Sequence, residues 1–129
     1  MSPDTALLLW ALVLFEVKHF VCEFVLQKRN PQLKAIYGNR FGLIHAGTHA
    51  LASLPAIFVL TDSAMLIGGI VVAEFVAHYH IDWLKAWLIK RRGLQYGNRL
   101  YWILFGADQL AHQITYVIIL AVLARSAGF

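Results

Sequence analysis

The chain has 129 residues, of which 60% are hydrophobic and only 14% are charged, and its formal net charge is +4. Soluble domains carry about 25% charged residues, so this composition excludes an ordinary water-soluble fold. Membrane topology and attraction to anionic headgroups explain the positive charge, so nucleic acid is not an expected partner.

Four apolar stretches follow one another along the chain. A helix that crosses a bilayer needs about 20 mainly apolar residues, and stretches of this kind lie at 5–27, 43–61, 64–88 and 100–124. We interpret the first as a retained span, because no basic segment precedes it as in a signal peptide. The sequence therefore predicts an all-α, polytopic membrane protein, a four-helix transmembrane bundle that forms one domain over residues 1–129.

The basic residues outside these spans predict the orientation, because short cytoplasmic loops carry an excess of lysine and arginine. The turn around Asp62 and Ser63 carries none. Those that follow the first and third spans are Lys28, Arg29, Lys34 and Arg40, and Lys90, Arg91, Arg92 and Arg99. We expect a protein of the bacterial inner membrane, with both basic loops in the cytoplasm and both termini on the outer, periplasmic side.

An internal repeat connects the two halves of the chain. The tetrapeptide Tyr-Gly-Asn-Arg occurs at 37–40 and again at 96–99, where a turn with an arginine anchor is favoured over a phosphate or headgroup site. Three polar pairs are separated by the same interval: His19 and His78, Glu23 and Asp82, and His49 and Asp108. The sequence predicts two parallel helix–loop–helix repeats, at about 5–61 and 64–124, related by an axis along the membrane normal.

Each span carries a pair of metal-ligating side chains four residues apart, which places both on one helical face. Ionisable groups are costly in a bilayer and face the interior of a bundle. The pairs are His19 and Glu23, His45 and His49, His78 and Asp82, and Asp108 and His112. We expect these groups to form one layer in the cytoplasmic half of the bundle.

Imidazoles and carboxylates at this spacing are the ligands with which four-helix bundles hold divalent metals. We predict a site for one or two divalent transition-metal ions, with zinc or iron as the first candidates, made of the eight paired residues. Glu16 and Glu74 are candidate proton carriers. Lys85 is expected to extend toward the headgroups rather than to pair with Asp82. The alternative is a buried polar network or proton relay without metal.

The same positions carry a family resemblance over nearly the whole chain. The runs His19-x3-Glu23-x3-Gln27, His45-x3-His49, His78-x3-Asp82-x2-Lys85 and Asp108-Gln109-x2-His112 resemble the bacterial family called domain of unknown function 3307. The resemblance implies a short integral membrane protein, a compact helical bundle with these polar positions as its signature. Where the family usually has aspartate, this chain has Glu23, which keeps the carboxylate but lengthens its reach. The family has no established reaction.

Three functions remain open. The first is a metal-dependent enzyme that acts on a lipid-soluble or headgroup substrate. The second is an accessory or structural subunit, whose partners would be lipids and other subunits of a membrane complex or further copies of the chain. The third is a proton or metal-ion conductor, which is disfavoured because the outer halves of the second and fourth spans are apolar and no span is expected to be broken.

Overall fold

The computed structural model describes residues 2–27 and 31–128, and every regular element in these two ranges is helical. The elements are α1 (Pro3–Phe20), the π-helical turn η1 (Val21–Val25), the 3₁₀ turn η2 (Pro31–Ala35), α2 (Arg40–Ala52), α3 (Leu54–Phe58), α4 (Ala64–Arg91) and α5 (Arg99–Ala127). Four helical segments of the described chain are long and apolar enough to cross a membrane: Asp4–Val25, Arg40–Phe58, Ala64–Arg91 and Arg99–Ala127. The prediction of an all-α fold with four apolar spans is confirmed.

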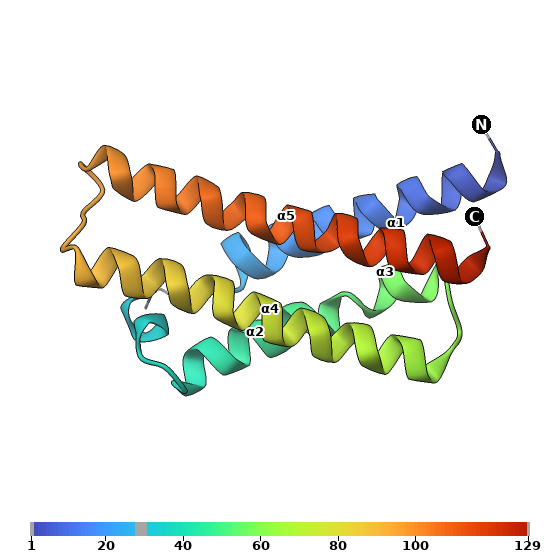
Figure 1. Cartoon of the computed structure of the whole chain (residues 1–129), viewed down its shortest axis with the longest axis horizontal. Helices are drawn as coiled ribbons and strands as arrows, with labels where there is room; N and C mark the ends of the chain where they lie inside the picture. Colours follow the sequence, from blue (N-terminus) through green and yellow to red (C-terminus); the bar gives the residue numbers. More distant parts are fainter. Residues whose placement is uncertain (1, 28–30, 129) are drawn as a thin grey trace.

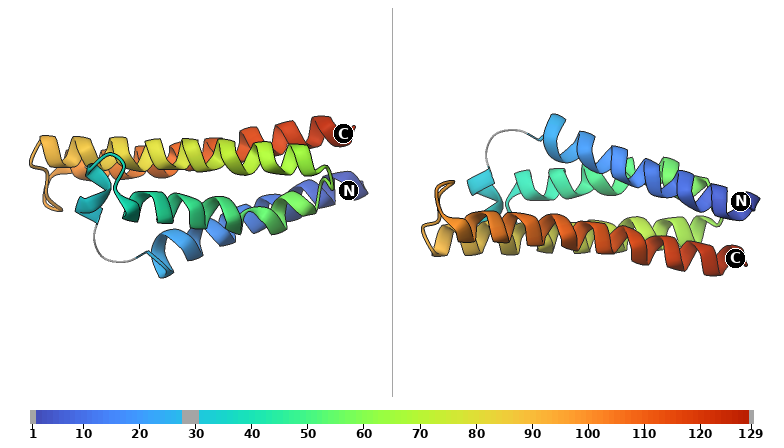
Figure 2. Two further views of the ribbon diagram at one scale, coloured as in Figure 1. Left: turned by 90° about the horizontal axis from the view of Figure 1, so that it is seen from below. Right: turned by 90° about the horizontal axis from the view of Figure 1, so that it is seen from above.

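The spans form a bundle in which α1 contacts α5 and α3, while α4 contacts α5 and α2. Both termini and the turn between α3 and α4 lie at one end of the bundle (Figure 1). The start of α2 and the connection between α4 and α5 lie at the other end, here called the loop end, in all three views (Figures 1 and 2). Lys28 and Arg29, two of the residues used to predict the orientation, lie outside the described residues.

Side-chain caps begin several of these helices. Asn39 Oδ1 accepts a hydrogen bond from the Phe41 N–H at 3.0 Å, and Ser63 Oγ accepts one from the Leu66 N–H at 3.4 Å. The repeated tetrapeptide ends at the first residue of α2 and of α5, Arg40 and Arg99. This position agrees with its interpretation as a turn, while the relation between two parallel repeats stays a prediction.

The first two spans are irregular. In η1 the Leu26 N–H bonds to the Val21 carbonyl at 2.9 Å, five residues back instead of four. The second span is interrupted at Ser53, between α2 and α3. Pro55 supplies no N–H to the turn before it and disfavours helical backbone at the preceding residue. The second span nevertheless continues as one helical segment, Arg40–Phe58, because Ser53 keeps right-handed helical backbone angles and its carbonyl accepts the Ile57 N–H at 3.0 Å.

Apolar packing holds the half of the bundle nearer the termini. Fully buried side chains here include Phe15, Ile57 and Leu123. Large apolar side chains also cover the outside, and Trp10 and Ile44 are each 65% exposed. A soluble protein rarely exposes so much contiguous apolar surface, whereas a lipid bilayer is the solvent that such a surface requires. The buried polar residues of the predicted pairs lie in the other half, nearer the loop end.

Candidate metal centre

The structure brings all eight predicted ligands into one cluster, in the half of the bundle nearer the loop end. His78 lies at its centre, with ring centroids 3.9 Å from His49, 4.1 Å from His112 and 5.2 Å from His45. The side chains of all eight are buried or nearly so, at most 9% exposed: His19, Glu23, His45, His49, His78, Asp82, Asp108 and His112. They come from η1 and from α1, α2, α4 and α5.

Asp82 and Asp108 each bind a lysine through one carboxylate oxygen and have the other oxygen near His112. Asp82 Oδ2 accepts a hydrogen bond from Lys34 Nζ at 2.6 Å, and Asp108 Oδ2 accepts one from Lys85 Nζ at 2.7 Å. Their other oxygens face one imidazole: His112 Nε2 lies 3.5 Å from Asp82 Oδ1 and 3.7 Å from Asp108 Oδ1. Each lysine thus holds one oxygen of an aspartate, and Lys85 Nζ also lies 3.6 Å from Asp82 Oδ1.

Several buried donor and acceptor atoms of the cluster have no hydrogen-bond partner within the described chain. They are both ring nitrogens of His49, Nε2 of His78 and of His112, and Oδ1 of Asp82 and of Asp108. Leaving such an atom unsatisfied costs about 1–3 kcal/mol, so native proteins rarely keep several together. A bound cation would satisfy one nitrogen of each imidazole and the two carboxylate oxygens, because each of these atoms can offer a lone pair, whereas the second His49 nitrogen carries a proton and needs an acceptor.

The separations between these atoms suit metal ligands. His49 Nε2 lies 3.6 Å from Glu23 Oε2, and His78 Nε2 lies 3.6 Å from Asp82 Oδ2. These distances are long for hydrogen bonds, but two ligands bound tetrahedrally to one zinc ion lie about 3.3 Å apart. The described residues contain three groups whose ligand atoms lie within 4.8 Å of one another: Glu23, His45, His49 and His78; His78, Asp82 and His112; and Glu23, Asp82 and Asp108.

His19 occupies a different position from the other predicted ligands. Its Nδ1 lies 2.9 Å from the Tyr116 hydroxyl and its Nε2 lies 2.9 Å from Gln109 Oε1. Gln109 donates from its amide nitrogen to Asp108 Oδ2 at 3.0 Å, so its oxygen accepts the His19 Nε2–H and the Tyr116 hydroxyl donates to Nδ1. Both nitrogens of His19 are engaged, and the structure places it as a support for Asp108 rather than among the groups that could hold an ion.

The two candidate proton carriers lie in contrasting places. Glu16 is exposed on α1, outside the cluster. Glu74 is buried and pairs with Lys18, whose Nζ also donates to the His49 carbonyl at 3.2 Å. Glu74 Oε2 has no hydrogen-bond partner among the described residues. Of the two, only Glu74 lies next to the cluster.

Sequence reasoning missed the role of two lysines. Lys34 was counted as a loop charge, yet it lies in η2 with 7% of its side chain exposed and reaches Asp82. The prediction that Lys85 extends to the headgroups was wrong, because its side chain is 12% exposed and binds Asp108. The spacing from Asp82 to Lys85 was a usable signal, since residues three apart share a helical face.

The charges of the buried cluster do not cancel. Among the described residues, three buried or nearly buried ammonium groups, Lys18, Lys34 and Lys85, face four carboxylates, Glu23, Glu74, Asp82 and Asp108. With neutral imidazoles these groups keep one negative charge. A buried unpaired charge is costly, so this excess favours either a bound cation or a proton on His45, whose Nε2 lies 2.9 Å from Glu23 Oε2 and 3.3 Å from Asp82 Oδ2.

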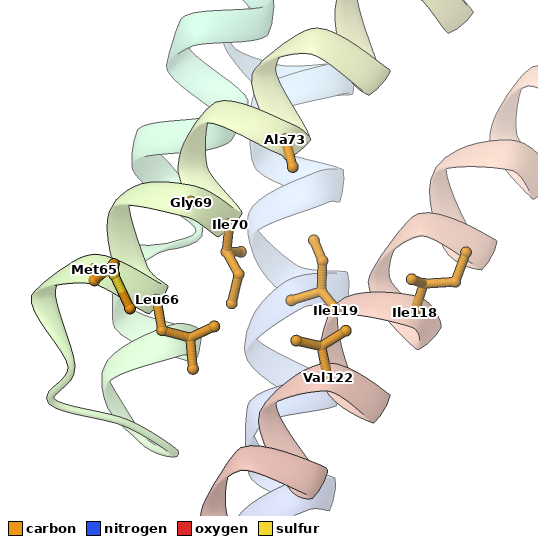
Figure 3. Close-up of a pocket in the computed structure, with 8 residues that line it drawn as sticks. All are labelled: Met65, Leu66, Gly69, Ile70, Ala73, Ile118, Ile119 and Val122. Carbon is orange, nitrogen blue, oxygen red and sulfur yellow. The ribbon is translucent and has the colours of Figure 1, made fainter.

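Two cavities lie on the surface of the bundle. One, of about 180 Å³, is lined partly by His45 and Lys34 and so adjoins the cluster. The other, of about 390 Å³, lies between the apolar halves of α4 and α5. Figure 3 shows that its labelled side chains, among them Ile70 and Ile119, carry only carbon apart from the sulfur of Met65. The second cavity offers no group for chemistry.

Comparison with known proteins identifies a family without a function. The model of a family described as a protein of unknown function (DUF3307) matches residues 11–128. No curated protein and no solved structure matches the chain. The matched range includes every residue of the buried cluster, and the family description assigns a role to none of them.

Proposed function

This chain belongs to the DUF3307 family of proteins of unknown function, and we propose that it is an integral membrane protein that binds one or two divalent transition-metal ions between its spans. The observation that carries the proposal is the set of unpartnered atoms on His49, His78, His112, Asp82 and Asp108. They converge from three helices, and mutual hydrogen bonds do not satisfy them.

The residues fit a metal of intermediate softness. Imidazole nitrogens and carboxylate oxygens suit zinc, iron or manganese, and zinc or iron is the first choice for this donor set. His78 belongs to two of the three ligand groups, so a second ion could adjoin the first. The lysines would then act as outer supports, because Lys34 and Lys85 each hold one oxygen of an aspartate whose other oxygen has no hydrogen-bond partner among the described residues.

The reaction that such a centre would support is hydrolysis or oxidation of a substrate within the membrane. A divalent ion polarises a substrate oxygen or activates water. The protein would supply Asp82 and Asp108 as fixed anionic ligands and the buried Glu74 as a nearby proton acceptor. A substrate that reaches a site between spans is itself lipid-soluble or carries its polar headgroup on an apolar anchor.

A structural or accessory subunit is the second candidate, and the lysines favour it. Lys18, Lys34 and Lys85 bind Glu74, Asp82 and Asp108, so three ion pairs could hold the spans together without metal. Conduction ranks third. At the irregularity in the second span, the freed His49 carbonyl already accepts bonds from Lys18 Nζ and Ser53 Oγ, each at 3.2 Å. Buried apolar side chains fill the bundle beyond it.

We place the protein in a bacterial inner membrane, with both termini on the periplasmic side. Support comes from the basic residues at the loop end, among them Arg40, Lys90 and Arg99, which the positive-inside rule assigns to the cytoplasm. The metal centre would then lie in the cytoplasmic half of the bilayer.

Elemental analysis of the detergent-purified protein tests the proposal. We expect about one or two zinc or iron ions per chain, lost in the His49→Ala and Asp108→Ala variants. His80→Ala is the matched control, because His80 is exposed and its hydrogen bonds among the described residues are those with Tyr37 and the Val76 carbonyl. Wild-type protein that binds no metal after reconstitution with zinc or iron would leave the structural subunit as the better account.

A further inference from the structure

The smaller cavity connects the outside of the bundle with the candidate metal centre. It lies where η1 and α2 meet, next to η2. Leu26 and Ile44, which are 58% and 65% exposed, form its outer wall. Lys34 and His45 lie at its inner end, where their side chains are only 7% and 9% exposed. The cavity thus has an apolar mouth and a polar inner end.

The inner end is in direct contact with the buried cluster. His45 Nε2 lies 2.9 Å from Glu23 Oε2 and 3.3 Å from Asp82 Oδ2, and Lys34 Nζ donates to the same Asp82 oxygen. A group bound beside His45 and Lys34 would therefore lie one side chain away from the candidate ion. This is the access that an enzyme with a buried centre requires.

Charge determines which polar group would bind there. Without an ion and with neutral imidazoles, the cluster and the ion pairs beside it carry four carboxylates against three ammonium groups, an excess that disfavours a bound anion. One divalent ion changes this balance to a net positive charge. The groups left to a ligand at the inner end are the Lys34 N–H that is not bonded to Asp82 or Gln27 and the second ring nitrogen of His45, whose Nε2 lies 2.9 Å from Glu23 Oε2. Phosphate and carboxylate oxygens are the groups that such donors recognise most strongly.

The size of the cavity and its position on the bundle indicate what the rest of the ligand is. A cavity of about 180 Å³ is smaller than the roughly 300–1,000 Å³ of sites that enclose a drug-sized ligand. It has room for a compact headgroup and the first carbons beyond it. Because Leu26 and Ile44 lie on the lipid-facing side, the remainder of the ligand would stay in the bilayer.

We propose that this cavity binds the anionic phosphate head of a membrane lipid, with the acyl chains left in the bilayer, and presents it to the metal centre. The inference rests on the proposed function, because the bound ion supplies the positive charge. It names the substrate class of that centre, a lipid phosphate monoester.

Native mass spectrometry of the zinc-loaded protein tests this assignment. The probes are dioleoyl phosphatidic acid, dioleoyl phosphatidylcholine and inorganic phosphate. We expect one phosphatidic acid per chain, bound about tenfold more tightly than phosphatidylcholine. The phosphate of phosphatidylcholine is also anionic, but it carries less charge and a bulky cationic choline that a small cavity beside a positively charged centre disfavours. Removal of zinc with a chelator should abolish this preference. Inorganic phosphate at the same concentration should not displace the lipid.

The chain offers a matched pair of variants. Thr48 lines the cavity, and its hydroxyl donates to the Ile44 carbonyl at 2.9 Å. Thr115 lies on α5 and does not line the cavity, and its hydroxyl makes the same kind of bond, to the Ala111 carbonyl at 3.0 Å. Thr48→Phe should fill the cavity and weaken phosphatidic acid binding about tenfold with zinc retained. Thr115→Phe should change neither. If Thr48→Phe loses its helical circular dichroism, Ile44→Trp replaces it, with Ile114→Trp as control.

Failure of this inference can be told apart from failure of the metal centre. Protein that holds zinc yet binds both lipids equally, or binds phosphatidic acid as well after Thr48→Phe as before, contradicts the lipid site alone. Displacement of the lipid by inorganic phosphate also contradicts it, because the acyl chains would then add nothing. Protein that holds no zinc overturns the proposed function together with the inference.

Discussion

His112 Nε2 and Asp82 Oδ1 lie 3.5 Å apart inside the bundle, and neither atom has a hydrogen-bond partner in the described part of the chain. The other oxygen of Asp82 lies 3.3 Å from His45 Nε2 and 3.6 Å from His78 Nε2. Asp82 is thus the carboxylate on which three imidazoles from three helices converge, and the site depends on its charge.

The negative charge of Asp82 can be removed without changing the size of its side chain. Asp82→Asn keeps the size of the side chain but replaces an anionic ligand with a neutral amide, so we expect zinc affinity to fall by more than about 100-fold, beyond the loss of a supporting residue. Isothermal titration of the metal-free protein measures this. The control is Asp62→Asn, which changes an exposed carboxylate in the turn before α4. Equal affinity in the two variants would exclude Asp82 as a ligand.

Lys85→Met separates a metal centre from a purely ionic network. Removing the ammonium group leaves Asp108 buried without its partner, which should cost roughly 3–5 kcal/mol in the free energy of unfolding of the metal-free protein. Saturating zinc should restore much of this stability, because the ion then balances the carboxylate. Lys90→Met, at an exposed position of α4, is the control. A loss that zinc leaves unchanged would favour the structural subunit.

Gln109→Leu tests the support of Asp108. Gln109 connects His19 to Asp108, so its loss should lower metal affinity by about 10–100-fold while the site can still be filled at high metal concentration. Gln113→Leu, four residues further along α5, is the matched control, since no hydrogen bond of its side chain is found within the described residues. An unchanged affinity in Gln109→Leu would remove it from the account of the site.

The orientation can be tested with single cysteines. In a Cys22→Ala background, Asp62→Cys at the exposed turn before α4 should react with a membrane-impermeant maleimide in intact cells. Arg92→Cys, at the loop end, should react only after the membrane is permeabilised. The opposite pattern would place both termini in the cytoplasm.

Much of the site follows from helical spacing alone. His78 and Asp82 lie one turn apart on α4 and Asp108 and His112 one turn apart on α5, and a polar pair within an apolar span must face the interior of the bundle. Spacing does not fix which nitrogen of a histidine is free. The hydrogen bonds of His19 depend on Tyr116 and Gln109, which lie on another helix.

The irregular backbone was harder to predict. Pro55 gave a local signal for the break at Ser53, which treating residues 43–61 as one apolar stretch overlooked. The π-helical turn that carries Glu23 has no comparable signal, because its residues, Val21–Val25, include neither proline nor glycine. The burial of Lys34 likewise depends on how η2 folds against α4.

The most direct test of the metal centre is X-ray absorption spectroscopy of the wild-type protein reconstituted with zinc. We expect a first shell of nitrogen and oxygen at about 2.0–2.1 Å, with the outer-shell scattering of at least two imidazoles and no sulfur. A spectrum without imidazole scattering, or one with a sulfur shell from Cys22, would contradict a centre built from His49, His78, His112 and the two aspartates.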